Sequence, residues 1–344
     1  MLTFIYRCLL IWFFFTTYAL AQTTPDDGDW KSNSATLKNT SEADVMIRIG
    51  DIDNLGFGFA QDFNPFTGKP TDIHPFPWLP QKGDYPGLDR ILVGSKFRKK
   101  SQPCSNDGYS NSNPESPIPI DLPLESAKGV KITSAMLTMF VDDFQAPYLC
   151  AKYIAYINGK RFGNLENILN TLNQGGPIGK FISVRIPQEM IELLNSQKLS
   201  VMIDDTSGAA DGFAIDFMKL LINPKPILYR NSITGYVQDK ETNEKIINAN
   251  VTVRGFGEAT TDSDGKFTVN NLPIGLIVAE ANSIGYQSGS EVFDVIQDEQ
   301  SNEQTIYLTK AKDISFQNKK VEVGQAITLN NIQFKVSSAE LNTD

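Results

Sequence analysis

Residues 181–222 read FISVRIPQEMIELLNSQKLSVMIDDTSGAADGFAIDFMKLLI. Three runs in this segment alternate apolar and polar side chains with a period of two, the pattern of strands with one buried face. They are Ile182/Val184/Ile186, Leu199/Val201/Ile203 and Phe213/Ile215/Phe217. Between the first two runs a helical pattern starts at Pro187. Its inward face consists of Met190, Ile191 and Leu194. The segment therefore predicts strands interrupted by one short helix.

The strand pattern also extends toward the N-terminus. The predicted strands are Val45–Ile49, Arg90–Phe97, Val130–Val141, Lys152–Ile157, Phe181–Ile186, Leu199–Ile203 and Gly212–Ile222. A second short helix is predicted where Leu165, Ile168, Leu169 and Leu172 share one face. Because about seven strands occur without the βαβ rhythm of a parallel sheet, the protein is predicted to be all-β. Residues 44–224 are expected to form an antiparallel, jelly-roll-like β-sandwich with two short helices.

Segments without apolar periodicity mark the limits of this domain. Residues 22–43 are rich in Thr, Asp, Ser and Asn and are expected to form a flexible lead-in. Residues 98–124 are rich in Ser, Asn, Pro and Gly, which is typical of a long surface loop. Pro224 and Pro226 end the last predicted strand and so mark the C-terminal boundary.

Residues 1–21 have the features of a signal peptide. Arg7 is their only charged residue, an apolar run covers residues 8–15, and Ala19-Leu20-Ala21 fits a signal-peptidase site. The apolar run is short for a membrane-spanning helix. We therefore expect export to the periplasm or to the outer-membrane or cell surface, with Gln22 as the mature N-terminus.

Two cysteines, Cys104 and Cys150, remain after removal of residues 1–21. An even pair in an oxidising compartment predicts a disulfide. It would close a loop of about 46 residues and stabilise the fold by about 3–4 kcal/mol in the chain-entropy model. The alternative is two unpaired thiols, of which Cys104 would be exposed to oxidation in a polar loop.

The charge and the histidine content argue against several function classes. A net charge of −9 repels a phosphate backbone, so nucleic acid is not an expected partner. His74 is the only histidine, whereas a zinc peptidase needs at least two imidazoles on the metal. No Gly-x-Ser-x-Gly surrounds a serine near it for a catalytic triad, and no nucleotide-binding glycine motif occurs.

A series of short motifs fills residues 231–310. In order they are Ile233-Thr234-Gly235-Tyr236-Val237, Ala249-Asn250-Val251-x-Val253, Thr261-Asp262-Ser263-Asp264-Gly265-Lys266-Phe267, Asn271-Leu272-Pro273-x-Gly275 and Gly285-Tyr286. Asp264-Gly265 suits a turn between two strands, because glycine accepts a positive φ. Together the motifs resemble the carboxypeptidase regulatory-like (transthyretin-like) domain. The resemblance implies a small β-sandwich that is an accessory module and not a catalytic one.

Residues 321–344 carry a shorter pattern. It consists of Val321-x-Val323-Gly324, then Leu329–Phe334, then Ser338–Leu341. This resembles the opening strand of an OmpA-family C-terminal domain, and the resemblance implies a peptidoglycan-binding module. The diagnostic Asp and Arg positions of that family lie further downstream, so no binding residue is carried over. We expect either a fragment of a longer chain or loss of the module.

Aspartates collect at the ends of the predicted strands. They are Asp51 and Asp53, Asp142 and Asp143, Asp204 and Asp205, and Asp211 with Asp216 around the last strand. Several carboxylates brought together suit a hard cation, so a structural Ca²⁺ is expected, with Asp51, Asp53, Asp142, Asp143, Asp204, Asp205 and Asp211 as candidate ligands. Asp51-x-Asp53-x-x-Gly56 also resembles part of a calcium loop, although Leu55 and Asp62 depart from an EF-hand. The alternatives are solvated turn aspartates or a glycosidase carboxylate pair.

Aromatic residues and five prolines crowd residues 57–85. Aromatic faces on a stiff loop can stack on sugar rings or on a protein partner. The candidate ligand-binding residues are Phe57, Phe59, Phe76, Trp78 and Tyr85. The alternative is a loop that folds back and buries its own rings.

These observations favour a non-catalytic, exported cell-envelope protein. It would bind a glycan or an envelope protein through the N-terminal sandwich and reach peptidoglycan through the OmpA-like module. The competing hypothesis is an extracellular glycan-acting enzyme that uses paired aspartates. A purely structural envelope protein is a third option that the sequence does not separate from the first.

Overall fold

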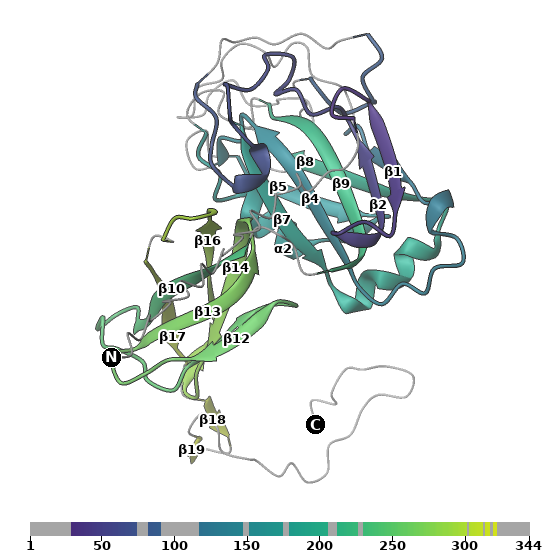
Figure 1. Cartoon of the computed structure of the whole chain (residues 1–344). Coiled ribbons are helices and arrows are strands. Elements are labelled where there is room, and N and C mark those ends of the chain that lie inside the picture. Colours follow the sequence, from purple (N-terminus) through teal and green to yellow (C-terminus); the bar gives the residue numbers. More distant parts are fainter. Residues whose placement is uncertain are drawn as a thin grey trace, which may run out of the picture.

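A computed structural model describes residues 29–73, 82–90, 117–146, 151–174, 179–205, 212–225, 230–300, 303–311, 314–316 and 319–321 (Figure 1). They form a larger N-terminal module and a smaller C-terminal one, both built from β-sheets. Within these residues, no helix has the length and apolar character needed to cross a lipid bilayer.

The largest sheet has nine strands and runs through both modules. Its N-terminal part has the spatial order β1 (Ser34–Lys38), β2 (Ala43–Ile49), β9 (Ala214–Pro224), β4 (Ala135–Asp142) and β7 (Lys180–Ile186). All neighbouring pairs in this part are antiparallel. The sheet continues through β14 (Gly275–Asn282), β11 (Asn250–Val253) and β12 (Gly257–Thr260), and β16 (Gly289–Val295) pairs with β14.

A second sheet completes the N-terminal sandwich. Its order is β3 (Ile120–Pro123), β8 (Lys198–Asp205), β5 (Tyr153–Ile157) and β6 (Lys160–Arg161). Apolar side chains of both sheets, such as Leu137, Leu220 and Val201, share one buried cluster. Helix α2 (Gly163–Leu169) and the 3-10 helices η3 (Glu125–Ala127) and η4 (Gln188–Asn195) add side chains to that cluster.

The C-terminal module is a small sandwich. A four-stranded sheet of β13 (Lys266–Pro273), β10 (Arg230–Asp239), β17 (Gln304–Lys310) and β15 (Tyr286–Gln287) shares a buried cluster with β14, β11 and β16. Gly265 has a φ of 68° in the turn before β13, as expected for a glycine at this position. Further along the chain, β18 (Ile314–Phe316) pairs with β19 (Lys319–Val321).

The central strands of the large sheet are buried on both faces. All eight residues of β4 are buried, and so are nine consecutive residues of β9, Ala214 to Ile222. One face packs against the second sheet. The other carries Phe140 and Phe217, which are covered by the loop after β2 and by its short 3-10 helix η1 (Pro65–Thr67).

Phe66 of η1 is the central side chain of this cover. Its ring lies 5.5 Å from that of Phe181, 5.7 Å from that of Phe217 and 5.8 Å from that of Trp30, measured between centroids. Phe66 also belongs to the buried cluster that contains the core of the C-terminal module. The two modules therefore share apolar packing.

Backbone contacts join the modules as well. Strand β14 pairs in parallel with β7 at Leu276 and Ile182. Gly275 has a φ of 111°, and a Cβ at this position would lie 3.1 Å from the carbonyl oxygen of Phe181, so glycine permits the close approach. Ser183 Oγ donates a hydrogen bond to the Ile274 carbonyl at 2.7 Å, and Lys180 Nζ lies 2.5 Å from Asp294 Oδ2.

The all-β prediction is confirmed. Strands β2, β5, β7, β8 and β9 lie where the alternation predicted strands, and β4 covers the C-terminal part of predicted Val130–Val141. Both predicted helices exist. The pattern that includes Leu165 forms α2, and the pattern after Pro187 forms the 3-10 helix η4. Of the predicted strand Arg90–Phe97, only Arg90 lies within the described residues. Residues 1–28 and 322–344 also lie outside them.

Two expectations are wrong in part. Residues 34–38 are not a flexible lead-in but strand β1, whose alternate side chains Ala35 and Leu37 pack against Met46 and Leu221. Residues 120–123, placed in a surface loop, form strand β3. Both strands are short and lie at sheet edges, where few apolar residues are needed and the sequence signal is weak.

We predict that Phe66→Ala destabilises the fold by about 3–5 kcal/mol, because it removes a fully packed ring at the centre of the shared cluster. Urea unfolding of the purified protein measures the change. Ile73→Ala is the control, since Ile73 is 69% exposed and its loss should change stability by less than about 0.5 kcal/mol. An equal effect of the two substitutions would contradict a central role for Phe66.

Candidate cation site

The loop after β2 carries two of the predicted acidic residues. Asp51 and Asp53 follow the strand directly, and both are half-buried. The loop folds around Asp53, whose Oδ1 accepts a hydrogen bond from the Gly56 N–H at 2.7 Å and whose carbonyl accepts one from the Gly58 N–H at 2.7 Å. Positive φ angles at Asn54 and Leu55 allow this tight turn.

A turn from a different part of the chain brings two more aspartates. Asp84 and Asp89 flank Tyr85-Pro86-Gly87-Leu88. Leu88 is buried in the main cluster, and the Asp89 N–H donates to the Ile215 carbonyl of β9 at 3.0 Å. These contacts hold the turn against the large sheet.

The fifth aspartate lies within strand β9 itself. Asp216 interrupts the apolar run of that strand and is 1% exposed. Its Oδ1 accepts a hydrogen bond from the Leu55 N–H of the loop at 2.8 Å. The strand therefore positions the loop as well as contributing a carboxylate.

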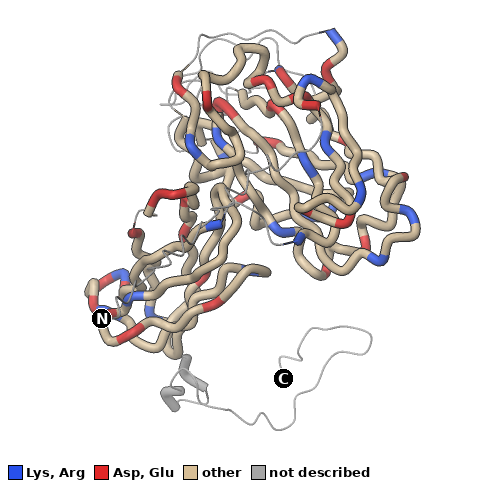
Figure 2. The backbone as a smooth tube through the Cα atoms, in the orientation of Figure 1, with Lys and Arg blue, Asp and Glu red and all other residues tan. Residues whose placement is uncertain are grey.

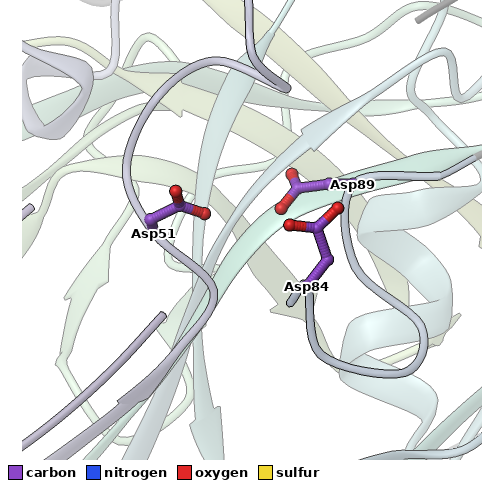
Figure 3. Close-up of side chains that lie close together, drawn as sticks. All are labelled: Asp51, Asp84 and Asp89. Carbon is purple, nitrogen blue, oxygen red and sulfur yellow. The ribbon is translucent and has the colours of Figure 1, made fainter. Parts of the chain in front are cut away.

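The five carboxylates form two overlapping groups of three. Oxygens of Asp51, Asp84 and Asp89 lie within 4.8 Å of one another, and so do oxygens of Asp53, Asp89 and Asp216. Asp89 belongs to both groups. Figure 3 shows the first group, in which Asp51 points from its loop toward the adjacent carboxylates of Asp84 and Asp89. In Figure 2, several acidic positions gather at the end of the larger module that lies away from the smaller one.

Burial and mutual repulsion raise the pKa of three of these acids, Asp51, Asp89 and Asp216. Burial is the largest cause at Asp89, followed by the charge of Asp216, and together they raise the pKa of Asp89 to about 10. Burial also raises the pKa of Asp216 well above its ordinary value, although the Leu55 N–H acts in the opposite direction. At Asp51, burial and then the charge of Asp53 raise the pKa.

Arg48, whose charge acts on Asp51, donates its hydrogen bonds to other groups. Arg48 is buried in β2 and donates hydrogen bonds to the carbonyls of Ser32 at 2.7 Å and Asp29 at 2.9 Å, and also to the Gly50 carbonyl. Its charge lowers the pKa of Asp51, but it is the smallest of the causes acting there. The group is thus rich in carboxyl oxygens, which are the donor atoms that hard cations prefer.

The structure brings together only part of the predicted ligand set. Asp51 and Asp53 belong to the two groups of three. Asp142 and Asp143 at the end of β4, and Asp204 and Asp205 at the end of β8, are in neither of the groups that the described residues form. Asp205 accepts a hydrogen bond from the Lys152 N–H at 2.8 Å, which ties β8 to the start of β5. Asp211 lies outside the described residues.

Asp84, Asp89 and Asp216 were not among the predicted ligands. A usable signal existed for Asp216, because a lone carboxylate inside Phe213–Ile222 is costly to bury without a partner. Asp84 and Asp89 carry no such signal. Their turn reaches the other acids only through the burial of Leu88 and the contact with β9.

The aromatic candidates have different surroundings. Phe59 stacks on Phe63 at 5.3 Å and packs edge-on against Phe140 at 5.7 Å, so it belongs to the cover of the large sheet. Tyr85 packs against the main buried cluster, whereas Phe57 is 38% exposed. Phe76, Trp78, His74, Cys104 and Cys150 lie outside the described residues. Ligand binding by the aromatic residues and the Cys104–Cys150 disulfide stay predictions.

Comparison with known proteins identifies one part of the chain. Residues 232–309 match the model of the carboxypeptidase regulatory-like domain family. The C-terminal module is thus similar to a carboxypeptidase regulatory-like domain. This confirms the resemblance that the motifs of residues 231–310 indicated, and the sandwich of β10 to β17 is the fold observed there. A search of curated protein sequences gives no significant match.

Some solved structures resemble parts of the chain. A cohesin–X-dockerin complex from Acetivibrio cellulolyticus is 16% identical over 26% of this chain and 64% of its own, with a TM-score of 0.20. The Bacillus anthracis TIE protein is 12% identical over 66% and 43%, with a TM-score of 0.21. A mutant of the shaft pilin SpaA from Lactobacillus rhamnosus GG is 10% identical over 65% and 97%, with a TM-score of 0.21. The matched parts thus span less than two thirds of the first two chains, and likeness at this level supports no conclusion about function.

We predict a pH dependence for the metal-free protein. Because the folded-state pKa of Asp89 is about 10 and its ordinary value is 3.8, the folded state keeps a proton that the unfolded state loses between these values. The contribution of Asp89 to the free energy of unfolding is therefore complete below pH 3.8 and is lost as the pH rises toward 10.

Asp89→Asn removes this dependence because the amide does not ionise. In buffer with a chelator, the stability of Asp89→Asn relative to the unmodified protein should increase from about pH 5 to about pH 8, two values inside this window. Urea unfolding at the two pH values measures it. Asp62→Asn, an exposed acid of the same loop, is the control and should show no such trend. A pH-independent difference for Asp89→Asn would contradict the raised pKa.

Proposed function

We propose that this chain is a non-catalytic, exported component of the bacterial cell envelope, in which the two modules act as one rigid structural and binding unit. The observation that carries the proposal is the continuity of the large sheet and of apolar packing from one module to the other. In such a unit the two modules do not move relative to each other, which suits a surface or periplasmic scaffold.

The character of the C-terminal module supports a non-catalytic role. It matches a regulatory-like family and not a catalytic one. The chain contains a single histidine, so a zinc peptidase centre with two imidazole ligands is not available to it. Among the described residues, the two acids whose pKa values are raised most, Asp89 and Asp216, belong to a cluster of five carboxylates. Such a cluster is more repulsive than an acid–base pair requires.

The envelope location rests on the sequence. The signal-like residues 1–21 support export. The OmpA-like pattern of residues 321–344 supports a tether to peptidoglycan, which would be made by the module that this pattern opens. Both are part of the proposal. The binding partner would be a glycan or another envelope protein.

Two measurements test the proposal. Expressed with residues 1–21 in a Gram-negative host, the protein should be cleaved after Ala21 and recovered in the envelope fraction. The purified mature chain should hydrolyse no member of a panel of polysaccharides, peptidoglycan and peptides. Retention of the uncut chain in the cytoplasm would overturn the export part. Turnover that is lost in Asp142→Asn, Asp143→Asn, Asp204→Asn or Asp205→Asn with the fold intact would overturn the non-catalytic part.

The rigid unit makes a separate prediction. A protease site placed between residues 225 and 230 allows the chain to be cut between the modules. After cutting, the two fragments should still elute together in gel filtration, because β7–β14 pairing, the Lys180–Asp294 ion pair and the packing of Phe66 hold them. The same cut in a Phe66→Ala background should weaken the association. Separation of the unmodified fragments in native buffer would contradict a shared core.

A further inference from the structure

The spacing of the five carboxylates fits one class of ligand. Two oxygens bound to the same calcium ion, each at about 2.4 Å, are at most about 4.8 Å apart. The oxygens in each group of three satisfy this limit. Zinc favours histidine and cysteine, and neither residue is present in the two groups. Magnesium requires a tighter octahedral shell and keeps several waters, so it is less suited to a cage of carboxylates.

A second observation, independent of the clustering, also indicates a bound cation. Asp216 and Asp89 are 1% and 3% exposed, and Asp216 Oδ2 and Asp89 Oδ1 are buried without a hydrogen-bond partner among the described residues. Asn54 Oδ1, on the same loop as Asp53, is also buried without one. Buried polar oxygens in native proteins have partners in the great majority of cases. Several such oxygens in one small region are what a coordinated cation would satisfy.

The ligands come from three separate segments of the chain. Asp51 and Asp53 lie on the loop after β2, Asp84 and Asp89 on the turn against the sheet, and Asp216 on β9. The peptide N–H groups of Leu55 and Gly56 already orient two of the carboxylates, so the arrangement exists in the folded chain. Asp51 and Asp84 are half-buried, which leaves a side from which an ion can enter.

We propose that Asp51, Asp53, Asp84, Asp89 and Asp216 form a Ca²⁺ site that fixes the loop after β2 against the large sheet. Calcium would replace the missing partners of the buried oxygens and neutralise part of their charge. The same loop continues into Phe59 and Phe66, so the bound ion would also stabilise the aromatic cover between the modules. This goes beyond the proposed function, which does not require a metal.

Calcium titration of the full chain tests the proposal. After removal of metals with a chelator, isothermal calorimetry and thermal melting are followed from about 10 μM to about 10 mM Ca²⁺, a range that covers extracellular calcium modules. The melting temperature should rise steadily with the logarithm of the calcium concentration, because the ion binds only the folded state. Mg²⁺ at the same concentrations should produce a smaller shift.

Three variants identify the ligands. Asp216→Asn and Asp51→Asn should lose the calcium-dependent shift, and Asp62→Asn should keep it. Without calcium, Asp216→Asn should melt at or above the temperature of the unmodified protein, since an amide removes repulsion from the buried group. Asp51 is only half-buried, so Asp51→Asn is expected to fold. It therefore tests the site even if Asp216→Asn does not fold.

The outcomes are distinct. A shift that is lost in both ligand variants and kept in Asp62→Asn supports the site. The proposal is overturned by the absence of heat and of any shift in the unmodified chain, by a shift that persists in Asp51→Asn and Asp216→Asn, or by a larger effect of Mg²⁺. None of these results depends on whether the protein is exported or lacks catalytic activity, so the two proposals fail separately.

Discussion

The burial of strands β4 and β9 on both faces is the constraint on which the rest of the structure depends. A sheet that exposes one face to water needs only one layer to cover it, but here Phe140, Phe181 and Phe217 make the second face apolar as well. Something has to cover them, and the chain uses two elements. The segment after β2 supplies Phe59 and Phe66, and the C-terminal module supplies its own core.

This constraint explains why the modules form one body. The C-terminal module is not an independent domain joined to the larger sandwich by a linker alone. Its strand β14 joins the large sheet at β7, and Gly275 permits the backbones to approach because a side chain would meet the carbonyl of Phe181. Apolar burial and sheet pairing at the same junction reinforce each other, since separation would expose the rings and leave strand edges unpaired.

The acidic group is a second consequence of the same loop. The chain leaves β2 with Asp51 and Asp53 before it reaches the aromatic cover, and Asp216 lies on the strand beneath. Burying Asp89 and Asp216 beside three half-buried carboxylates is unfavourable, as the raised pKa values of these two acids indicate. A native fold tolerates such a cost where function or a ligand requires it. The loop after β2 thus carries both part of the acidic group and the aromatic side chains that pack between the modules.

Four features could be predicted from the sequence: the all-β class, five strands of the larger module, both short helices and the family resemblance of the C-terminal module. These features are encoded locally, by a period of two in strands such as Phe181–Ile186 and by motifs such as Asp264-Gly265. The sequence also indicated Asp51 and Asp53, because acids at a strand end form a local pattern. The partners of these acids could not be predicted, because they are distant in sequence and meet only in the folded chain. Asp84 lies 31 positions after Asp53, and Asp216 lies 165 positions after Asp51. The edge strands β1 and β3 and the shared core were likewise hidden, because they depend on which surfaces meet in space and not on the order of neighbouring residues.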